Sequence, residues 1–571
     1  MASIWLTITP EYNLFHLPPV LPKQPTLVHT EIMTETYDYI IVGAGSAGCV
    51  LAERLTAGGK HKVLLLEAGG SDRQFYISMP LGYGKLFYNP KVNWLYKTEP
   101  DAGLAGQQDH WPRGKVLGGS SSINAMVYVR GQTEDFDAWK AAGNDGWGWD
   151  DVLPAYKALE DNEAGANAYR GTGGPYFISA NARDCHALVA PYIASAEAAG
   201  LPYNPDFNGA TQEGVGSYQM SIKNGRRNSA SRAFLRTAKT RSNLKIMSHA
   251  QATKILFEDN RAIGVEYLRQ GKLHSAKANR EIIVCGGAIN SPQLLQLSGI
   301  GPAALLKSHG IEVKVANENV GRHLQDHVGI NYTWRMNVPT LNDELRPWWG
   351  KLRVGLKYLL TRSGPLSLSV NHGGGFFRTN PKLKRPNMQL YMQAFSTLLP
   401  KAGERPVLSP DPFSGMSIGL SNCHPTSRGE IMIKSANPFE HPRITANALS
   451  TDHDVAEMLD AVKFLRTIAS HNPLRNLIEE ELRPGPVVQS DDELIADFRQ
   501  RSGTVYHPSC TCRMGPDAET SVVDAHLRVH GVQGLRVVDA SAFPSITSGN
   551  INAPVIMMAW KAAEMILADA S

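Results

Sequence analysis

The chain has 571 residues, of which 42% are hydrophobic and 19% charged, and its formal net charge is +4. A chain of this length exceeds a single hydrophobic core, so two or more domains are expected. The small net charge and the absence of a Lys/Arg-rich run argue against a nucleic-acid partner. The sequence contains no uncharged apolar run of about 18 residues, so a transmembrane helix is not expected. Peripheral membrane contact and an oligomeric state both stay open.

Six scattered cysteines are too few for a disulfide framework, which favours a reducing compartment. We therefore expect a cytoplasmic protein, with contact to the inner face of a membrane as an alternative. Cys510 and Cys512 beside His507 lack a fourth ligand, so no metal is predicted. Residues 1–35 contain prolines and no basic leader, and are predicted to be a loose arm or an added start, with Met33 as the working start.

The stretch Tyr37–Gly48 predicts a dinucleotide-binding turn. An apolar, β-rich run, Tyr39–Val42, leads directly into the pattern G-x-G-x-x-G, and apolar residues at helical spacing follow it. A second apolar run, Val63–Leu66, ends in Glu67. A glycine turn in another α/β fold is the alternative interpretation, but it does not explain the acid at position 67.

Each residue of this unit has a mechanical role. Gly43 permits the tight turn, Gly45 lets backbone N–H groups approach a pyrophosphate at the positive end of the helix, and Gly48 lets helix and strand pack closely. Glu67 lies where a carboxylate accepts hydrogen bonds from adenosine ribose hydroxyls. The pattern alone does not distinguish NAD from FAD.

A second glycine cluster runs from Arg113 to Met126. Its small side chains would let the backbone press against a planar or charged ligand. The alternative, a solvated Gly/Ser linker, is disfavoured by the flanking apolar residues and the absence of charge after Lys115.

The following elements are predicted from periodicity and turn residues. Residues 135–159 indicate helices broken at 143–148, residues 187–199 a helix, and residues 226–237 a loop that enters a helix. Strands are predicted at 244–246, 253–257 and 262–268. Ile282–Cys285 is predicted as a short buried strand, followed by a helix with Ser291 as N-cap and Pro292 in the first turn.

Residues 330–500 have a different sequence pattern, which predicts a separate, substrate-facing domain. Strand-like runs such as Met388–Met392 and Ile431–Ile433 alternate with long loops and one strong helix at 454–469. The C-terminal stretch returns to the earlier pattern: a strand at Leu535–Ser541, a polar turn, and a helix opened by Pro554.

Four of these later segments, in this order after the glycine turn, resemble the glucose–methanol–choline (GMC) family of flavin oxidoreductases. Gly114–Asn124 is similar to the first family signature and Gly287–Gly301 to the second. Val505–Pro508 is similar to the segment with the catalytic histidine, and Asn550–Pro554 to the closing flavin-contact turn. Within the family the chain resembles the bacterial choline dehydrogenase and aliphatic alcohol dehydrogenase group.

The resemblance implies an α/β fold with a discontinuous, Rossmann-like FAD-binding domain and an inserted mixed substrate domain. The FAD-binding domain would comprise residues 36–186, 226–330 and 504–571, and the substrate domain residues 187–225 and 331–503.

The resemblance also implies FAD, bound non-covalently because Ile123, at the position of the family's flavin-linking histidine, has no nucleophile. The residues expected to hold FAD are Gly43, Gly45, Ser46, Ala47, Gly48, Glu67, Ala68, Gly114, Val116, Gly118, Ser122, Asn124, Ala125, Met126, Val127, Ala252, Asp539, Ala540, Asn552 and Pro554.

The implied reaction is oxidation of a primary alcohol to an aldehyde, with hydride transfer to flavin N5. His507 is the expected base, because imidazole titrates near neutrality. Asn550 is expected to orient the substrate oxygen, with Asn552 as the rival for that role. The alternative for both is that they only cap the turn.

His372, His424 and Tyr506 are expected to line the substrate pocket. Choline is disfavoured because residues 362–385 contain no acid to oppose a quaternary ammonium. The acceptor is oxygen or quinone-like, with a dehydrogenase preferred over an oxidase. Choline dehydrogenase, a hydroxynitrile lyase-type flavoprotein, light-driven decarboxylation and a flavin-binding protein without catalysis are the alternatives.

Overall fold

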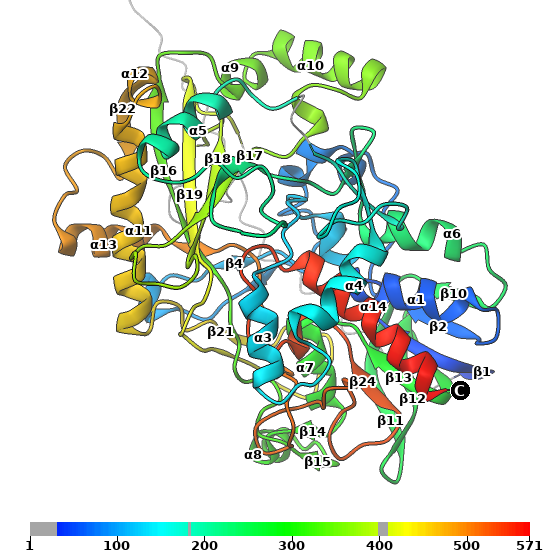
Figure 1. The fold of residues 1–571 in the computed structure, drawn as a ribbon. Helices are drawn as coiled ribbons and strands as arrows, with labels where there is room; N and C mark the ends of the chain where they lie inside the picture. Colours follow the sequence, from blue (N-terminus) through cyan, green and yellow to red (C-terminus); the bar gives the residue numbers. More distant parts are fainter. Residues whose placement is uncertain (1–30, 181–183, 398–408, 571) are drawn as a thin grey trace, which may run out of the picture.

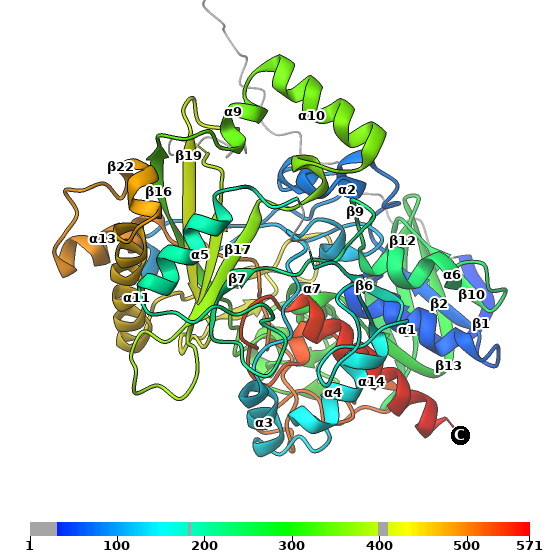
Figure 2. The same cartoon turned by 45° about the horizontal axis from the view of Figure 1, so that its top comes forward.

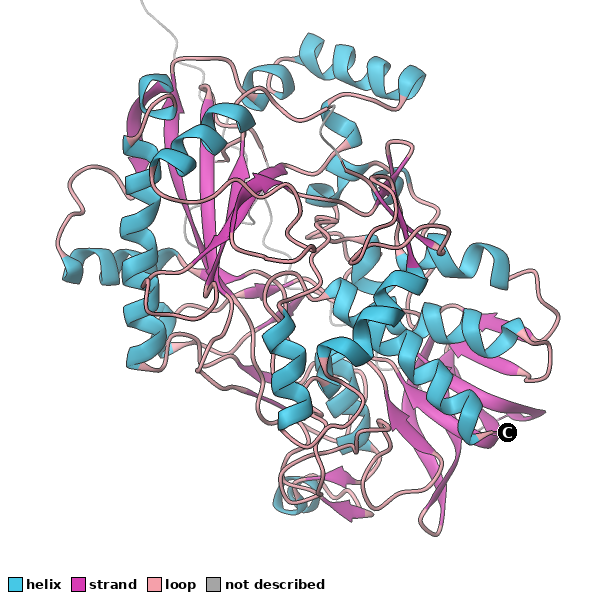
Figure 3. Ribbon diagram, viewed as in Figure 1, coloured by secondary structure: helices cyan, strands magenta, loops and turns pink. Residues whose placement is uncertain are grey.

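Two seven-stranded sheets organise the fold of the computed structural model, which describes residues 31–180, 184–397 and 409–570 (Figure 1). The ribbon separates them plainly, with one sheet at each side of the molecule (Figure 3). The predicted α/β class is confirmed. The predicted arm at residues 1–30 lies outside the described residues.

The first sheet has a parallel core. Its order is β10-β2-β1-β13-β12-β11, with β24 also paired to β13. Pairs β10–β2, β2–β1, β1–β13 and β13–β24 are parallel, as in a Rossmann-like fold. Its strands are β1 (Glu31–Val42), β2 (Val63–Leu66), β10 (Leu244–Met247), β11 (Ala250–Glu258), β12 (Arg261–Arg269), β13 (Lys272–Val284) and β24 (Leu535–Val537).

Helices cover the parallel strands because these strands are apolar on both faces. Ile40, Ile41, Leu64 and Leu65 are fully buried. Helices α1 (Ser46–Ala57) and α14 (Asn552–Asp569) pack side by side although they lie at opposite ends of the chain (Figures 1 and 2). The C-terminal helix therefore reaches the same sheet end as the glycine turn.

Three expectations about this part are wrong. β1 begins at Glu31 and pairs in parallel with β13 from His274 on, so residues 31–35 belong to the first strand. β13 is thirteen residues long because its N-terminal half pairs with β12 in a hairpin. Helix α7 (Gly287–Leu297) begins four residues before Ser291, whose hydroxyl instead donates to Asp539 at 2.6 Å and is not an N-cap.

The second sheet is antiparallel, in the order β22-β16-β19-β18-β17-β7 with β23 also paired to β16. Helices α5 (Val189–Ala198) and α11 (Asp452–Ser470) pack against it. Its strands are β7 (Gly214–Ser217), β16 (Val328–Met336), β17 (Asn371–Phe377), β18 (Met388–Gln393), β19 (Gly415–Asn422), β22 (Ile478–Arg483) and β23 (Gly503–Thr504).

Residues 330–500 hold more helix than the single one predicted. The additional helices are α9 (Leu341–Leu345), α10 (Trp348–Thr361), α12 (Leu474–Leu477) and α13 (Asp491–Arg501). The α13 start carries a sequence signal, a capping box of Ser490 and Glu493. No helix among the described residues combines the length and apolar character needed to cross a membrane.

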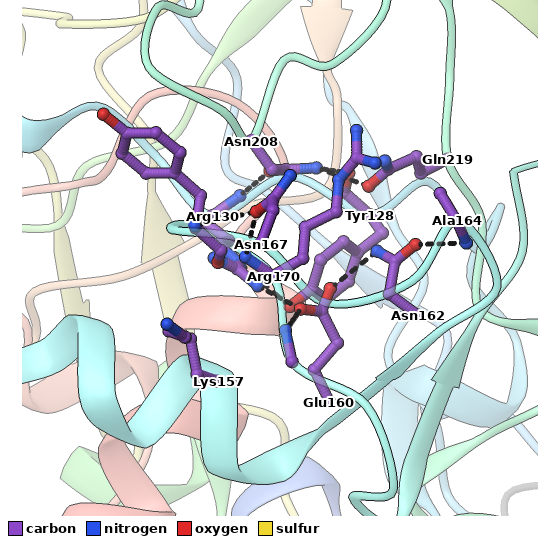
Figure 4. A network of polar contacts seen from close by, with 12 residues as sticks. Tyr128, Arg130, Lys157, Glu160, Asn162, Ala164, Asn167, Arg170, Asn208 and Gln219 are labelled. Atoms are coloured by element: carbon purple, nitrogen blue, oxygen red, sulfur yellow. Dashed lines mark hydrogen bonds and ion pairs between the residues drawn. The ribbon is translucent and has the colours of Figure 1, made fainter.

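A buried ion pair fixes the chain that follows the second glycine segment (Figure 4). The guanidinium of Arg130 pairs with Glu160 at the end of α4 (Trp149–Leu159), and both side chains are fully buried. Asn162 donates to the same carboxylate at 3.0 Å, and Asn208 accepts from the Arg130 backbone at 2.8 Å. A buried charge pair survives only when its remaining donors and acceptors are also satisfied, as here.

Candidate active site

A cavity of about 1510 Å³ lies between the two sheets. It is lined by both glycine segments, by strand β16 at Gly329–Asn331, and by the segments that carry His507 and Asn550. Its volume exceeds the roughly 300–1,000 Å³ of an ordinary small-molecule pocket. It therefore has room for a dinucleotide and a small substrate together.

The first glycine turn leaves an uncapped helix end at the cavity. Gly43 has φ of +104°, and a Cβ there would lie 2.5 Å from the carbonyl oxygen of Cys285. A Cβ on Gly48 would lie 1.9 Å from the carbonyl oxygen of Gly43. The N-cap of α1 is Gly45, which has no capping side chain, so the first N–H groups of the helix stay free to bind an anion.

Glu67 braces this turn from the end of β2. One carboxylate oxygen accepts from the Gly69 backbone at 2.8 Å and the other from Ala44 at 3.0 Å. Burial raises the pKa of Glu67 to about 7, although the two hydrogen bonds favour the charged form and lower it. Each oxygen keeps a lone pair, so ribose hydroxyls can still bind to it.

The second glycine segment packs backbone to backbone against the first. The Gly118 amide donates to the carbonyl oxygen of Ala44 at 2.7 Å. A Cβ on Gly119 would lie 2.7 Å from the Cα of Gly45, and a Cβ on Gly114 would lie 2.2 Å from the Gly119 carbonyl oxygen. Only glycine permits this approach, which places both segments at the same cavity.

Most residues expected to hold the cofactor line the cavity. Those that do are Gly43, Gly45, Ser46, Ala47, Glu67, Ala68, Gly114, Asn124, Ala125, Met126, Val127, Ala252, Asp539, Ala540 and Asn552. Those that do not are Gly48, Val116, Gly118, Ser122 and Pro554. Of these, Gly48 and Gly118 contact the lining segments from behind, as described above.

Arg227, which the sequence did not indicate, holds the end of the second segment. It is 1% exposed and its Nη1 donates to the Asn124 side-chain oxygen at 2.7 Å. The same Asn124 oxygen accepts from the Met126 amide at 3.1 Å. Met126 has φ of +63°, a strained conformation for this residue type that the surrounding hydrogen bonds maintain.

His507 lies at the centre of a chain of three hydrogen bonds. Its Nε2 lies 3.2 Å from Nδ2 of Asn550. Its Nδ1 lies 3.0 Å from Nδ1 of His327, and Nε2 of His327 lies 3.1 Å from the carbonyl oxygen of Cys423. His327 is fully buried.

These contacts fix the tautomer of both rings. A carbonyl oxygen only accepts, so Nε2 of His327 carries hydrogen and its Nδ1 has a lone pair. Nδ1 of His507 must then donate to His327, which leaves a lone pair on Nε2 of His507, beside the Asn550 amide. Burial lowers the pKa of His327 to about 3 and the pKa of His507 well below its ordinary value, so both rings are neutral at pH 7.

Two further contacts hold the His507 loop. The His507 backbone amide donates to Asp326 at 2.8 Å, and Arg113 donates to the Tyr506 carbonyl oxygen at 2.6 Å. Burial raises the pKa of Asp326 to about 7. Tyr506, with φ of +72°, lines the cavity. The stretch Gln325–Val328 matched none of the motifs recognised in the sequence, so Asp326 and His327 were missed.

Asn550 and Asn552 have different partners. Asn550 contacts His507 and accepts from Gln389 at 3.2 Å. Asn552 accepts from the Ser46 hydroxyl at 2.7 Å and donates to Tyr176 at 3.0 Å, so its amide joins the starts of α14 and α1. The Asp539 carboxylate accepts from two backbone amides, those of Gly287 and Ser541, each at 2.8 Å.

His372 and His424 do not line the cavity, contrary to expectation. Side chains alternate along a strand, and on β17 the lining residue is Asn371, so His372 points the other way and accepts from the His186 amide at 3.1 Å. The His424 ring contacts the Ser548 hydroxyl at 2.8 Å and Asp135 at 3.3 Å.

Comparison with known proteins identifies relatives along nearly the whole chain. Residues 37–329 match the N-terminal region of the GMC oxidoreductase family, and residues 425–559 match its C-terminal region. An alcohol dehydrogenase [acceptor] of Pseudomonas putida is 44% identical, over 93% of this chain and 96% of that protein. An oxygen-dependent choline dehydrogenase of Photobacterium profundum is 41% identical, over 94% of each. The crystal structure of pyridoxine 4-oxidase from Mesorbium loti superposes with a TM-score of 0.83 at 32% identity, over 92% of this chain and 98% of that one.

Proposed function

Because the chain belongs to the GMC oxidoreductase family, whose members are FAD flavoproteins, we propose that it oxidises a primary alcohol to an aldehyde with FAD and with His507 as the base. The observation that carries the proposal is the position of Nε2 of His507, which lies at the cavity and 3.2 Å from Nδ2 of Asn550. A neutral, buried imidazole beside a single amide donor suits removal of a hydroxyl proton.

The residues at the cavity fit FAD. The uncapped start of α1 would hold the pyrophosphate, and Glu67 the ribose. The start of α14, also without a side-chain cap, would offer its positive end to the flavin. Ile123 lines the cavity and has no nucleophilic atom, which supports non-covalent binding. When bound, FAD supplies a two-electron acceptor for the α-hydrogen of the alcohol.

The protein's own groups orient and deprotonate the alcohol. Nε2 of His507 receives the hydroxyl proton, while His327 holds Nδ1–H of the same ring in place. The Asn550 amide, which donates to Nε2 of His507 in this structure, would donate to the alcohol oxygen instead once the alcohol hydroxyl donates to the lone pair of Nε2. As negative charge develops on the oxygen, this donor stabilises it without taking the proton.

An uncharged alcohol suits the lining better than choline does. Among the described residues that line the cavity, the carboxyl groups are those of Glu67, Asp109 and Asp539. Each accepts backbone hydrogen bonds; those of Asp109 come from Thr504 at 2.7 Å and His110 at 2.8 Å. The choline dehydrogenase relatives keep choline as the second candidate.

The first experiment is a panel of primary alcohols, including choline, added anaerobically to the holoenzyme. Bleaching of the flavin absorbance by an uncharged primary alcohol supports the proposal. If choline alone bleached the flavin, choline would replace an uncharged alcohol as the proposed substrate. If no alcohol bleached it, a lyase-type flavoprotein would be favoured. Reoxidation by air or by a quinone then identifies the acceptor, for which we propose a quinone-like compound.

We also propose that the first sheet belongs to the FAD-binding domain and the second to the substrate domain, with residues 31–35 added to the former. The supporting observation is that β1, β2, β10 to β13 and β24 share one sheet, whereas β7, β16 to β19, β22 and β23 share the other.

A further inference from the structure

Helix α10 exposes a row of large apolar side chains. Six of its residues are roughly half or more exposed: Trp348 76%, Trp349 54%, Leu352 54%, Leu356 49%, Leu359 52% and Leu360 82%. The helix lies at the outer edge of the molecule in both views (Figures 1 and 2). This row is not needed for packing, because other residues of α10 attach it to the protein.

The exposed row lies opposite the packed side of the helix. Gly350, Val354 and Tyr358 are buried. At about 100° per residue, the six exposed apolar residues span an arc of about 120°, centred about 180° from the three buried ones. The helix therefore has two apolar faces, of which one faces water. An ordinary surface helix has one.

Two aromatic residues of α2 (Phe75–Ser78) are also exposed beside α10. Phe75 is 52% and Tyr76 46% exposed, and the Phe75 ring lies 6.5 Å from the ring of Tyr358, on the packed side of α10. We call the six exposed apolar residues of α10 the α10 patch. An exposed apolar surface of this kind marks a binding site for a protein or a membrane.

Cations flank the patch. Lys351, Arg353 and Lys357 are exposed beside the apolar row, and residues 345–385 contain no Asp or Glu. Arg226 and Arg232 lie near Tyr358. Burial raises the pKa of Tyr358, and the charges of these two arginines partly oppose that rise. Two nearby carboxylates oppose these cations: Glu344 pairs with Arg353 at 3.3 Å, and Asp72 acts on Arg232.

We propose that the α10 patch docks on an anionic lipid surface. Tryptophan and leucine on one face with lysine and arginine at its borders is the composition of helices that lie in a membrane interface. The apolar side chains would enter the headgroup boundary, the two tryptophans would lie at headgroup level, and the cations would face lipid phosphates.

The helices at the docked face also contribute residues to the lining of the cavity. Leu345, Lys351 and Tyr76 belong to α9, α10 and α2, and all three line it. An apolar alcohol or a quinone-like acceptor could therefore move between the bilayer and the cavity without crossing bulk water. This consequence rests on the proposed function, whereas the docking itself does not.

The test is flotation of the full-length holoenzyme with vesicles of phosphatidylcholine, with and without phosphatidylglycerol. We expect binding to the anionic vesicles only. Leu352→Asp/Leu356→Asp should weaken it at least about tenfold, and Lys357→Gln about fivefold. The matched control is Val487→Asp: Val487 is 81% exposed and lies between β22 and α13, outside the α10 patch, so this change should leave binding intact.

Flavin absorbance and circular dichroism check that the variants are folded. Failure of the wild type to bind anionic vesicles, or equal loss in Val487→Asp, would overturn the proposal. So would a dimer in light scattering that Leu352→Asp/Leu356→Asp converts to a monomer, because a second copy would then cover the patch. Bleaching of the flavin by a short, water-soluble alcohol is measured in parallel, so that failure of the proposed function is separated from failure of docking.

Discussion

Nε2 of His507 lies 3.2 Å from the amide nitrogen of Asn550, 43 positions later in the chain. The contact joins the loop after β23 to the turn before α14. Two segments that are separated in the sequence therefore meet at one atom of a buried imidazole. The amide hydrogens and the imidazole lone pair that the chemistry needs are both present at this point.

Replacing Asn550 tests whether its amide stabilises the developing alkoxide. We expect Asn550→Ala to retain FAD and to slow anaerobic flavin reduction by about 10- to 100-fold, the worth of a hydrogen bond to a charged group. Stopped-flow absorbance measures the rate. Asn552→Ala is the comparison, and should weaken FAD retention more than the rate, because Asn552 joins Ser46 and Tyr176. If Asn552→Ala slowed flavin reduction and Asn550→Ala weakened FAD retention, Asn552 would be the residue that stabilises the alkoxide.

Replacing His327 tests the tautomer that the network imposes. His327→Phe removes the acceptor for Nδ1–H of His507, so the ring loses its preferred orientation, and flavin reduction should slow by about tenfold or more. His327→Gln retains an acceptor oxygen and should recover part of the rate. The pH profile is the second readout: the limb assigned to His507 should move in the Phe variant. An unchanged profile in both variants would mean that His327 only fills space.

Buried neutral histidines make the folded protein sensitive to acid. Burial, the largest cause, lowers the pKa of His327 to about 3 and that of His372 to about 4, below the ordinary value of 6.5. As the pH falls from 6.5, the unfolded chain binds protons that the folded chain does not. The free energy of unfolding should therefore fall by up to about 1.4 kcal/mol per pH unit for each histidine.

Urea unfolding between about pH 7 and about pH 5 measures this slope. His372→Asn should give a shallower dependence than the wild type, since one buried titrating group is gone. An equal slope would show that His372 is protonated in the folded state. His372 is chosen for the comparison because it lies outside the cavity.

The ion pair of Arg130 and Glu160 predicts a large stability effect. Glu160→Ala leaves a fully buried guanidinium unpaired, and should lower the free energy of unfolding by about 3–5 kcal/mol. Arg130→Met/Glu160→Leu removes both charges and should recover most of the loss in the same urea assay. If the double variant were no more stable than the single one, the remaining hydrogen bonds of the network would carry the stability instead.

The first sheet could be predicted because its signals are local. Residues 39–67 contain a strand, a turn, a helix and an acid in contiguous order, and each has its own residue pattern. Ser291 shows the limit of local reasoning. Ser-Pro is a good helix start, yet Gly286 and Gly287 open α7 earlier, and the Ser291 hydroxyl binds Asp539, 248 positions away.

The rest of the site depends on contacts that sequence patterns do not encode. His507 and Asn550 were found through family motifs, but His327 contacts His507 across 180 positions without a motif of its own. The apolar residues of α10 were equally visible in the sequence. Periodicity alone could not say that Val354 and Tyr358 pack inward while Leu352 and Leu356 face water, because both sets are apolar.

The assignment of His507 as the base is best tested with the His507→Ala holoenzyme. We expect this variant still to bind FAD, since His507 is not part of either glycine segment. We expect its flavin to be reduced by a primary alcohol at least about 100-fold more slowly than the wild-type flavin under anaerobic conditions. Flavin reduction at the wild-type rate would contradict the assignment of the base.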